Sequence, residues 1–179
     1  GKILSGFWPH KIKWKFNFYS AHSAGFFIKN KSQKILGFYN NKRQAQSFPT
    51  EFSQVFLLWE KIEGGYHSKQ WKRSEGPDKP YREKYHRMVE HPPNRIVVEN
   101  YNLDWTRNPK CDMIFTWDGQ AWNGRVIGDE CIIAGGIVTS EVRITRDVYE
   151  SKDKAVTPGG LKVFGGDEMY RLNKTKSHI

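Results

Sequence analysis

Residues 111–144 carry the pattern that most restricts what this chain can fold into. They read CDMIFTW, DG, QAWNGRV, IGDE, CIIAG and GIVTSEVRI, which are apolar, aromatic and β-branched runs separated by Asp-Gly or Gly-Asp pairs. Such runs with turn residues between them are typical of consecutive antiparallel strands. In the first run the alternate residues from Cys111 to Trp117 are all apolar, so one face of that strand is hydrophobic. The stretch therefore predicts a β-meander.

Similar patterns recur on both sides of the meander. A short helix is expected at 42–47, with Asn40 or Asn41 as its cap. The segment 147–156 is expected to be a polar connection, and 81–89 is either a strand or a helix. Further strands are expected at 52–62, 66–72, 95–103, 161–164 and 168–172. Nine or ten short strands with hardly any helix favour a barrel or a sandwich.

Length and charge narrow the function classes. With 179 residues the chain is long enough for one domain with a substantial core. Its net charge is +10, but residues 1–50 hold 9 Lys and Arg and no acid, so the rest of the chain holds 20 basic and 19 acidic side chains. A nucleic-acid-binding barrel would need its basic residues on the barrel itself. We therefore expect no nucleic-acid partner, and no apolar run is long enough to predict a membrane span.

The N-terminal segment differs from the rest of the chain. Residues 11–19, KIKWKFNFY, alternate apolar and polar side chains as a strand does. Three interpretations stay open: an additional native strand, a targeting or membrane-surface arm, or a remnant of a cloning vector. We interpret 1–27 as an appended basic and aromatic segment and 28–179 as a single barrel domain.

The chain has two cysteines, Cys111 and Cys131. They begin the first and third strands of the meander at the same end, and a disulfide between them requires the second strand to stop short. Buried thiols are the expected state, with a disulfide as the alternative. The six histidines and the two cysteines show no metal-ligand spacing, so no metal site is expected.

Several short motifs occur in a fixed order over residues 35–170. Those in the meander are Cys111-Asp112-Met113-Ile114, Trp117-Asp118-Gly119, Gly124-Arg125-Val126, Cys131-Ile132 and Ser140-Glu141 with Ile144. Those before it are the Asn-x-x-Gln-Ala opening at 41–45, Gln70, Pro80-Tyr81-Arg82 and Glu99-Asn100-Tyr101. In order and spacing these motifs resemble the T-type phycobiliprotein chromophore lyases, the CpcT/CpeT family. The compressed C-terminal part is similar to the short forms encoded by viruses of marine cyanobacteria.

The resemblance implies an all-β fold, an antiparallel up-and-down β-barrel of the calycin or lipocalin type with a short N-terminal helix. It also implies a lyase that attaches phycoerythrobilin or phycocyanobilin to a cysteine of a phycobiliprotein β-subunit, forming a carbon–sulfur bond in a largely chaperone-like manner. The bilin is then a substrate, and no permanently bound cofactor is expected. The implied location is the cytoplasm of a cyanobacterium, or of an infected host, and a homodimer is a further expectation. A non-catalytic carrier of bilin or another lipophilic ligand is the alternative.

A linear tetrapyrrole needs flat apolar walls, cations for its two propionates and acceptors for its pyrrole N–H groups. Glu99 and Asp112 are expected to be the catalytic groups. The expected ligand-binding residues are Gln70, Trp71, Tyr81, Arg82, Tyr101, Trp117, Trp122 and Arg125.

Each of these assignments has a structural alternative. Trp117 and Trp122 flank a tight turn and could be ordinary hairpin packing. The two arginines could form surface ion pairs. Glu99 is solvated if its strand face points outward, and its role then passes to Asp112 or to an acid not yet identified. Where the family has a Glu-Gln pair this chain has Lys69-Gln70, so a carboxylate is missing from that strand or the alignment is shifted by one residue.

Overall fold

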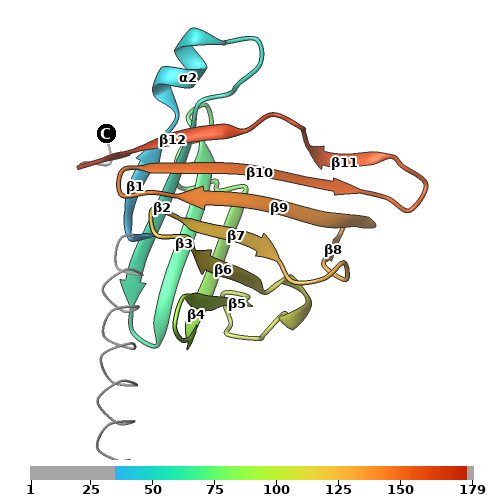
Figure 1. Cartoon of the computed structure of the whole chain (residues 1–179). Coiled ribbons are helices and arrows are strands. Elements are labelled where there is room, and N and C mark those ends of the chain that lie inside the picture. The colour runs from blue at the N-terminus through green and yellow to red at the C-terminus, as the bar shows by residue number, and fades with distance from the viewer. Residues whose placement is uncertain (1–34, 177–179) are drawn as a thin grey trace, which may run out of the picture.

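The computed structural model describes residues 35–176, which are mostly β-structure (Figure 1). The one α-helix of this part is α2 (Lys42–Ser47), and a short 3-10 helix, η2, spans Pro109–Cys111. The strands are β1 (Gly37–Asn40), β2 (Val55–Ile62), β3 (Gly65–Lys72), β4 (Arg82–His91), β5 (Arg95–Tyr101), β6 (Met113–Trp117), β7 (Trp122–Val126), β8 (Ile132–Ile133), β9 (Gly136–Ile144), β10 (Val148–Val156), β11 (Lys162–Gly165) and β12 (Tyr170–Thr175).

Ten of these strands form a closed antiparallel barrel. Around the ring they follow the order β1-β2-β3-β4-β5-β6-β7-β9-β10-β12. The ring closes because β9 pairs with β10 and β12 pairs with β1. Closure leaves no ring strand with an unpaired edge. The predicted all-β, calycin-like barrel is confirmed.

The two remaining strands extend the barrel on one side. β8 pairs with the start of β9, and β11 pairs with the end of β10, so the four strands form a small sheet that projects beyond the ring (Figure 1). A second cluster of buried residues lies under this extension: Cys111, Val126, Cys131, Val138 and Ala155.

The main core runs along the barrel interior and includes Trp122 at the end where β6 turns into β7. On β2 the buried residues Val55, Leu57 and Trp59 alternate with more exposed ones, as expected for a strand with one face inside. Trp117 and Trp122 are Cα partners at the turn between β6 and β7, and their ring centroids are 5.5 Å apart. Trp122 is 1% exposed. We call the end of the barrel that holds these two tryptophans the apolar end.

Most expected elements occur where the sequence places them, with one clear exception. The helix spans the expected residues, and 81–89 belongs to a strand, β4. The expectation of a polar connection at 147–156 is wrong, because these residues form β10. The inward positions of β10 include Tyr149 and Ala155 but also the polar Asp153, so the strand lacks a simple apolar alternation.

Cys111 and Cys131 form a disulfide, with their Cα atoms 4.8 Å apart. β7 ends at Val126, opposite Met113, and therefore does not extend between the two cysteines. The second strand of the meander therefore stops short, as a disulfide between the two cysteines requires. The expectation of two buried thiols is wrong, and the alternative is correct.

Three further expectations concern the N-terminal segment, membrane-spanning helices and metal sites. The appended segment 1–27 lies outside the described residues. Within residues 35–176 no helix has the length and apolar character needed to cross a bilayer. In the same range no group of three or more His, Cys, Asp or Glu side chains is arranged to hold a metal ion.

Candidate functional site: the polar end of the barrel

The barrel interior becomes polar toward the end opposite the two tryptophans. This polar end is where β3 ends, β4 begins and β10 leaves the ring. The space there, which we call the polar cavity, is lined by side chains from β2 to β6, η2, β9 and β10: Trp59, Ser68, Gln70, Arg82, His86, Val98, Asn100, Cys111, Met113, Phe115, Val142, Tyr149 and Asp153. More than half of these side chains are polar or carry a polar atom, which is unusual for a barrel interior.

Gln70 and Arg82 lie side by side in this cavity. They are Cα partners on β3 and β4 and both line the same space. Neither side chain makes a hydrogen bond or ion pair with another residue of the described chain. A cation inside a barrel without a protein partner is costly, so this arrangement favours an anionic ligand.

His86 is held as a neutral ring beside Arg82. Its Nδ1–H donates to the backbone carbonyl of Glu99 at 3.1 Å, so its Nε2 accepts from the Ser68 hydroxyl at 2.7 Å. Burial, followed by the positive charge of Arg82, lowers the pKa of His86 to about 3. The Ser68 oxygen therefore keeps its lone pairs for a further donor.

Two buried polar atoms of the cavity lack a well-formed hydrogen bond. One is Asn100 Oδ1, although the residue is only 5% exposed. The other is Trp59 Nε1, which lies near the Tyr149 hydroxyl. Leaving a buried acceptor unpaired costs about 1–3 kcal/mol. An N–H donor on a ligand would remove that cost at Asn100.

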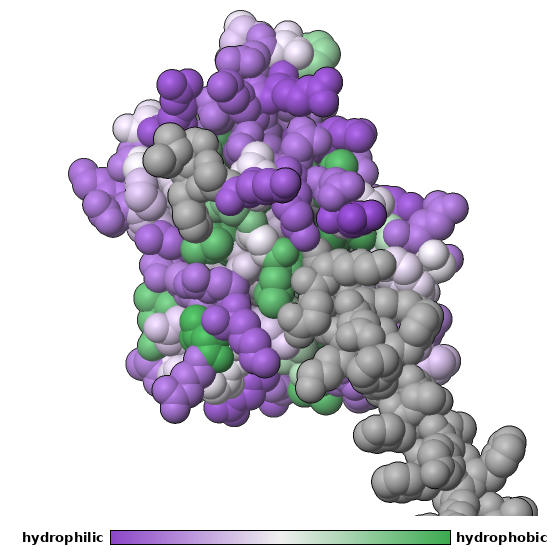
Figure 2. Space-filling view, turned by 90° about the vertical axis from the view of Figure 1, so that its left-hand side faces the viewer, coloured by the Kyte–Doolittle hydropathy of each residue, from purple (hydrophilic) through white to green (hydrophobic). Residues whose placement is uncertain are grey.

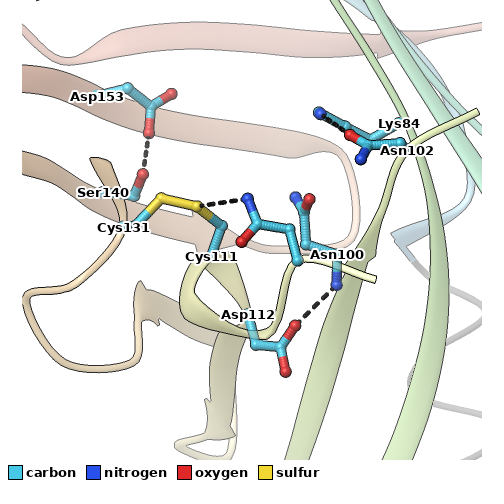
Figure 3. The surroundings of a disulfide bond; sticks show 9 residues. Lys84, Asn100, Asn102, Cys111, Asp112, Cys131, Ser140 and Asp153 are labelled. Atoms are coloured by element: carbon cyan, nitrogen blue, oxygen red, sulfur yellow. Dashed lines mark hydrogen bonds between the residues drawn. A yellow bond between two sulfur atoms is a disulfide. The ribbon is translucent and has the colours of Figure 1, made fainter. Parts of the chain in front are cut away.

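Asp153 supplies the negative charge of the cavity. Its Oδ1 accepts a 2.5 Å hydrogen bond from Ser140 on β9, beside the disulfide (Figure 3). Burial, with Asp153 next in importance, raises the pKa of Tyr149 above its ordinary value. The same two causes raise the pKa of Tyr81 to about 12, although that residue is half-exposed at the rim. Both hydroxyls therefore stay protonated and can donate.

The polar cavity is small in the observed arrangement of its side chains. Its volume is about 20 Å³, which is room for about one water molecule. A bilin is many times larger, so the lining side chains would have to be displaced to accommodate one.

Three expected site residues lie together, but outside the barrel. The Tyr101 hydroxyl donates to Glu99, and Arg107 Nη2 lies 2.9 Å from Glu99 and 2.6 Å from Asp112. Asp112 also accepts from the backbone N–H of Asn100. The face of β5 that carries Glu99 points outward, as one of our alternatives supposed. These carboxylates are engaged by protein partners and fix the loop before β6.

The other expected residues are divided between the two surfaces of the barrel wall. Gln70 and Arg82 line the cavity, and Tyr81 lies at its rim. Trp117 and Trp122 are inside but at the apolar end, where they pack as a hairpin pair. Trp71 and Arg125 lie on the outer surface, and Arg125 is exposed. Ligand binding by any of them stays a prediction.

Sequence reasoning missed most of the polar lining. Ser68 and His86 could have been found from strand alternation, since each lies an even number of residues from Gln70 or Arg82. Asn100 lies inside the Glu-Asn-Tyr motif and points the opposite way from its two neighbours. Asp153 had no signal, because its strand was not expected.

The closed antiparallel barrel is calycin-like in architecture. No family model matches the chain, and no curated protein matches it in sequence. Among solved structures it is similar to the T-type phycobiliprotein lyase CpeT from Prochlorococcus phage P-HM1. The identity is 28%, the match covers 83% of this chain and 97% of that chain, and the TM-score is 0.66.

A second solved structure, the CRL protein of Arabidopsis, shares the fold. It is 13% identical, the match covers 82% of this chain and 96% of that chain, and the TM-score is 0.64. The resemblance to the T-type lyases that the sequence motifs indicate is confirmed by the first of these two structures.

Proposed function

We propose that the polar end of the barrel binds a linear tetrapyrrole and that the protein is a bilin lyase. The observation that carries the proposal is the unpaired Arg82 guanidinium inside the barrel, in the same cavity as the unpaired carbonyl oxygen of Asn100. The similarity to a T-type lyase supports the same conclusion.

The cavity offers partners for one propionate, the pyrrole N–H groups and the apolar ring surface of a bilin. Arg82 can form two charge-assisted hydrogen bonds with one propionate. Asn100 Oδ1 and the Asp153 carboxylate can accept from pyrrole N–H groups, and the Ser68 oxygen can accept from a third donor. The apolar side chains of Trp59, Met113 and Phe115 line the remaining wall.

The attached cysteine belongs to the acceptor protein in this proposal. Its thiolate adds to the ethylidene carbon of the bilin, the double-bond electron pair moves toward the ring, and the ring takes up one proton. The net change is addition of S–H across a C=C bond, without oxidation or reduction. The protein contributes positioning, exclusion of water and a proton-transfer group.

Asp153 is the best candidate for that proton-transfer group. Glu99 and Asp112 are held by Arg107 outside the barrel, so neither reaches the cavity. Asp153 lines the cavity and is oriented by Ser140. Because Glu99 points outward, its expected role passes to another acid, and we propose that this acid is Asp153.

The decisive experiment separates binding from transfer. The protein is mixed with phycoerythrobilin or phycocyanobilin, and then with an apo-phycobiliprotein β-subunit. We expect a red-shifted, sharpened bilin band, followed by a covalent adduct on the acceptor. A shifted band without any adduct would leave the carrier function, and no change in the band would contradict both.

A further inference from the structure

A groove outside the barrel has the composition of a second ligand site. It lies over β1, β2, β3 and the loop that follows β3, and its volume is about 590 Å³. We call it the outer groove; its lining residues are Asn40, Lys42, Gln54, Phe56, Leu58, Lys69, Trp71, Arg73, Gly76 and Pro77. Small-molecule sites usually have volumes of about 300–1,000 Å³.

The floor of the outer groove is apolar and flat. Phe56 and Trp71 are stacked, with ring centroids 5.5 Å apart and an angle of 19° between the rings. Phe38 packs against both rings, with its centroid 5.8 Å from that of Phe56 and 5.8 Å from that of Trp71. Because the rings support one another, the floor is rigid, and a flat unsaturated ligand can lie on Phe56, Leu58 and the edge of Trp71.

The walls of the outer groove are positively charged. Lys42, Lys69 and Arg73 line it, and none of its described lining residues is acidic. None of the three cations forms an ion pair with a described residue. Arg73 donates to the neutral Gln54 Oε1 at 3.3 Å, and the Lys69 ammonium lies 5.7 Å from the centroid of the Trp71 ring. Cations arranged around a concave surface without counter-charges attract an anion.

The backbone under the groove has no free hydrogen-bonding groups to offer a peptide. β1 pairs with β12 and β2, and β2 and β3 pair with neighbours on both sides. An extended peptide that adds to a sheet needs a free strand edge. Recognition in the groove therefore depends on side chains, namely a flat apolar floor and three cations.

From these observations we propose that the outer groove binds a compact aromatic dicarboxylate of one or two rings, a flat dianion much smaller than a bilin. This site is separate from the polar cavity, which lies on the other side of the barrel wall. The proposal goes beyond the bilin function and does not depend on it.

The test uses naphthalene dicarboxylate as a fluorescent probe with the full chain. We expect saturable binding at one site, and at least tenfold weaker binding of the dimethyl ester. Lys69→Gln with Arg73→Gln should weaken binding of the free acid about tenfold or more, because two charge-assisted contacts are lost. The matched control, Lys61→Gln with Lys162→Gln, removes the same charge from exposed positions outside the groove and should bind as the parent does.

Other results would overturn the proposal. Equal binding of acid and ester would show that the cations take no part. Equal weakening in the control pair would show general attraction to a basic protein. Displacement of the probe by a glutamate-rich peptide at a similar concentration would show that the groove recognises acidic protein segments instead.

A further variant keeps this result separate from the bilin function. Arg82→Gln should leave probe binding unchanged, and the groove variants should leave the bilin absorbance shift unchanged. If Arg82→Gln abolished probe binding, the probe would be in the polar cavity and the outer groove would be no site.

Discussion

Arg82 and Gln70 face the interior of the barrel as direct neighbours on adjacent strands, and neither has a side-chain partner in the described chain. Arg125, the other arginine in a family-like motif, is exposed on the outer surface of β7. The two arginines therefore make a matched pair for experiment, one inside and one outside.

Replacing Arg82 by lysine should lower bilin affinity about tenfold, on the order of 1.4 kcal/mol. Lysine keeps the charge but loses the forked geometry that fits a carboxylate. The measurement is an absorbance titration with the bilin and with its dimethyl ester. The ester should bind the parent and the variant equally, and Arg125→Lys should behave like the parent. A loss of affinity in Arg125→Lys alone would assign the propionate to the outer surface.

Replacing Asp153 by asparagine should leave bilin bound but slow its transfer to the acceptor. The amide keeps the size of the side chain and its acceptance from Ser140, but it cannot exchange a proton. Transfer is followed as covalent chromophore on the denatured acceptor. Glu99→Gln is the control, and it should transfer at close to the parent rate because Glu99 lies outside the barrel. The opposite ranking would restore the role we first expected for Glu99.

Replacing Trp122 by alanine should lower the free energy of unfolding by about 3–5 kcal/mol, since a ring that is 1% exposed leaves a large void. Urea denaturation followed by circular dichroism measures the change. Bilin affinity of the folded fraction should stay near that of the parent, because the ring lies at the apolar end. Weakened binding without loss of stability would place the ligand at that end instead.

Removing the disulfide by the double change Cys111→Ser with Cys131→Ser should lower the stability by about 3 kcal/mol, given the sequence separation of 20 residues. Bilin transfer should persist below the lowered unfolding temperature, because the thioether forms on the acceptor's cysteine. If the folded double variant bound bilin but no longer transferred it, a thiol of this protein would take part in the reaction.

His86 should make the protein less stable as the pH falls. Its pKa is lowered to about 3 in the folded chain, whereas the unfolded ring titrates near its ordinary value of 6.5. Between these values the unfolded state binds more protons, so stability rises with pH and is lost as the pH falls from about 6.5 toward 3. Carboxylates titrate in the same range, so the measured quantity is the difference between the parent and His86→Gln. A difference that does not change between pH 7 and pH 4 would mean that His86 can be protonated without cost.

The barrel was largely predictable, because most of its strands alternate apolar and polar residues between clear turns. β10 was missed for a physical reason: its inward side chains include Asp153, which lines the cavity and disrupts the apolar alternation. The same property hid Asp153 as a site residue.

The candidate site was predictable only in part. Motif resemblance marked Gln70 and Arg82, which line the cavity, but it also marked Glu99 and Asp112, which stabilise the loop around Arg107. A motif does not reveal which way a strand faces, and residues next to one another in a strand point to opposite sides of the wall. Where described residues are visible in Figure 2, the face is mostly hydrophilic, with small separated apolar patches.

The central claim is that the polar end of the barrel binds bilin through Arg82, and the most direct test is the bilin absorbance spectrum on titration with parent protein and with Arg82→Gln. We predict a red-shifted, sharpened band with the parent, and the same band with Arg82→Gln only at protein concentrations at least tenfold higher. A parent titration that leaves the spectrum of the free bilin unchanged, or an Arg82→Gln titration that coincides with the parent's, would contradict it.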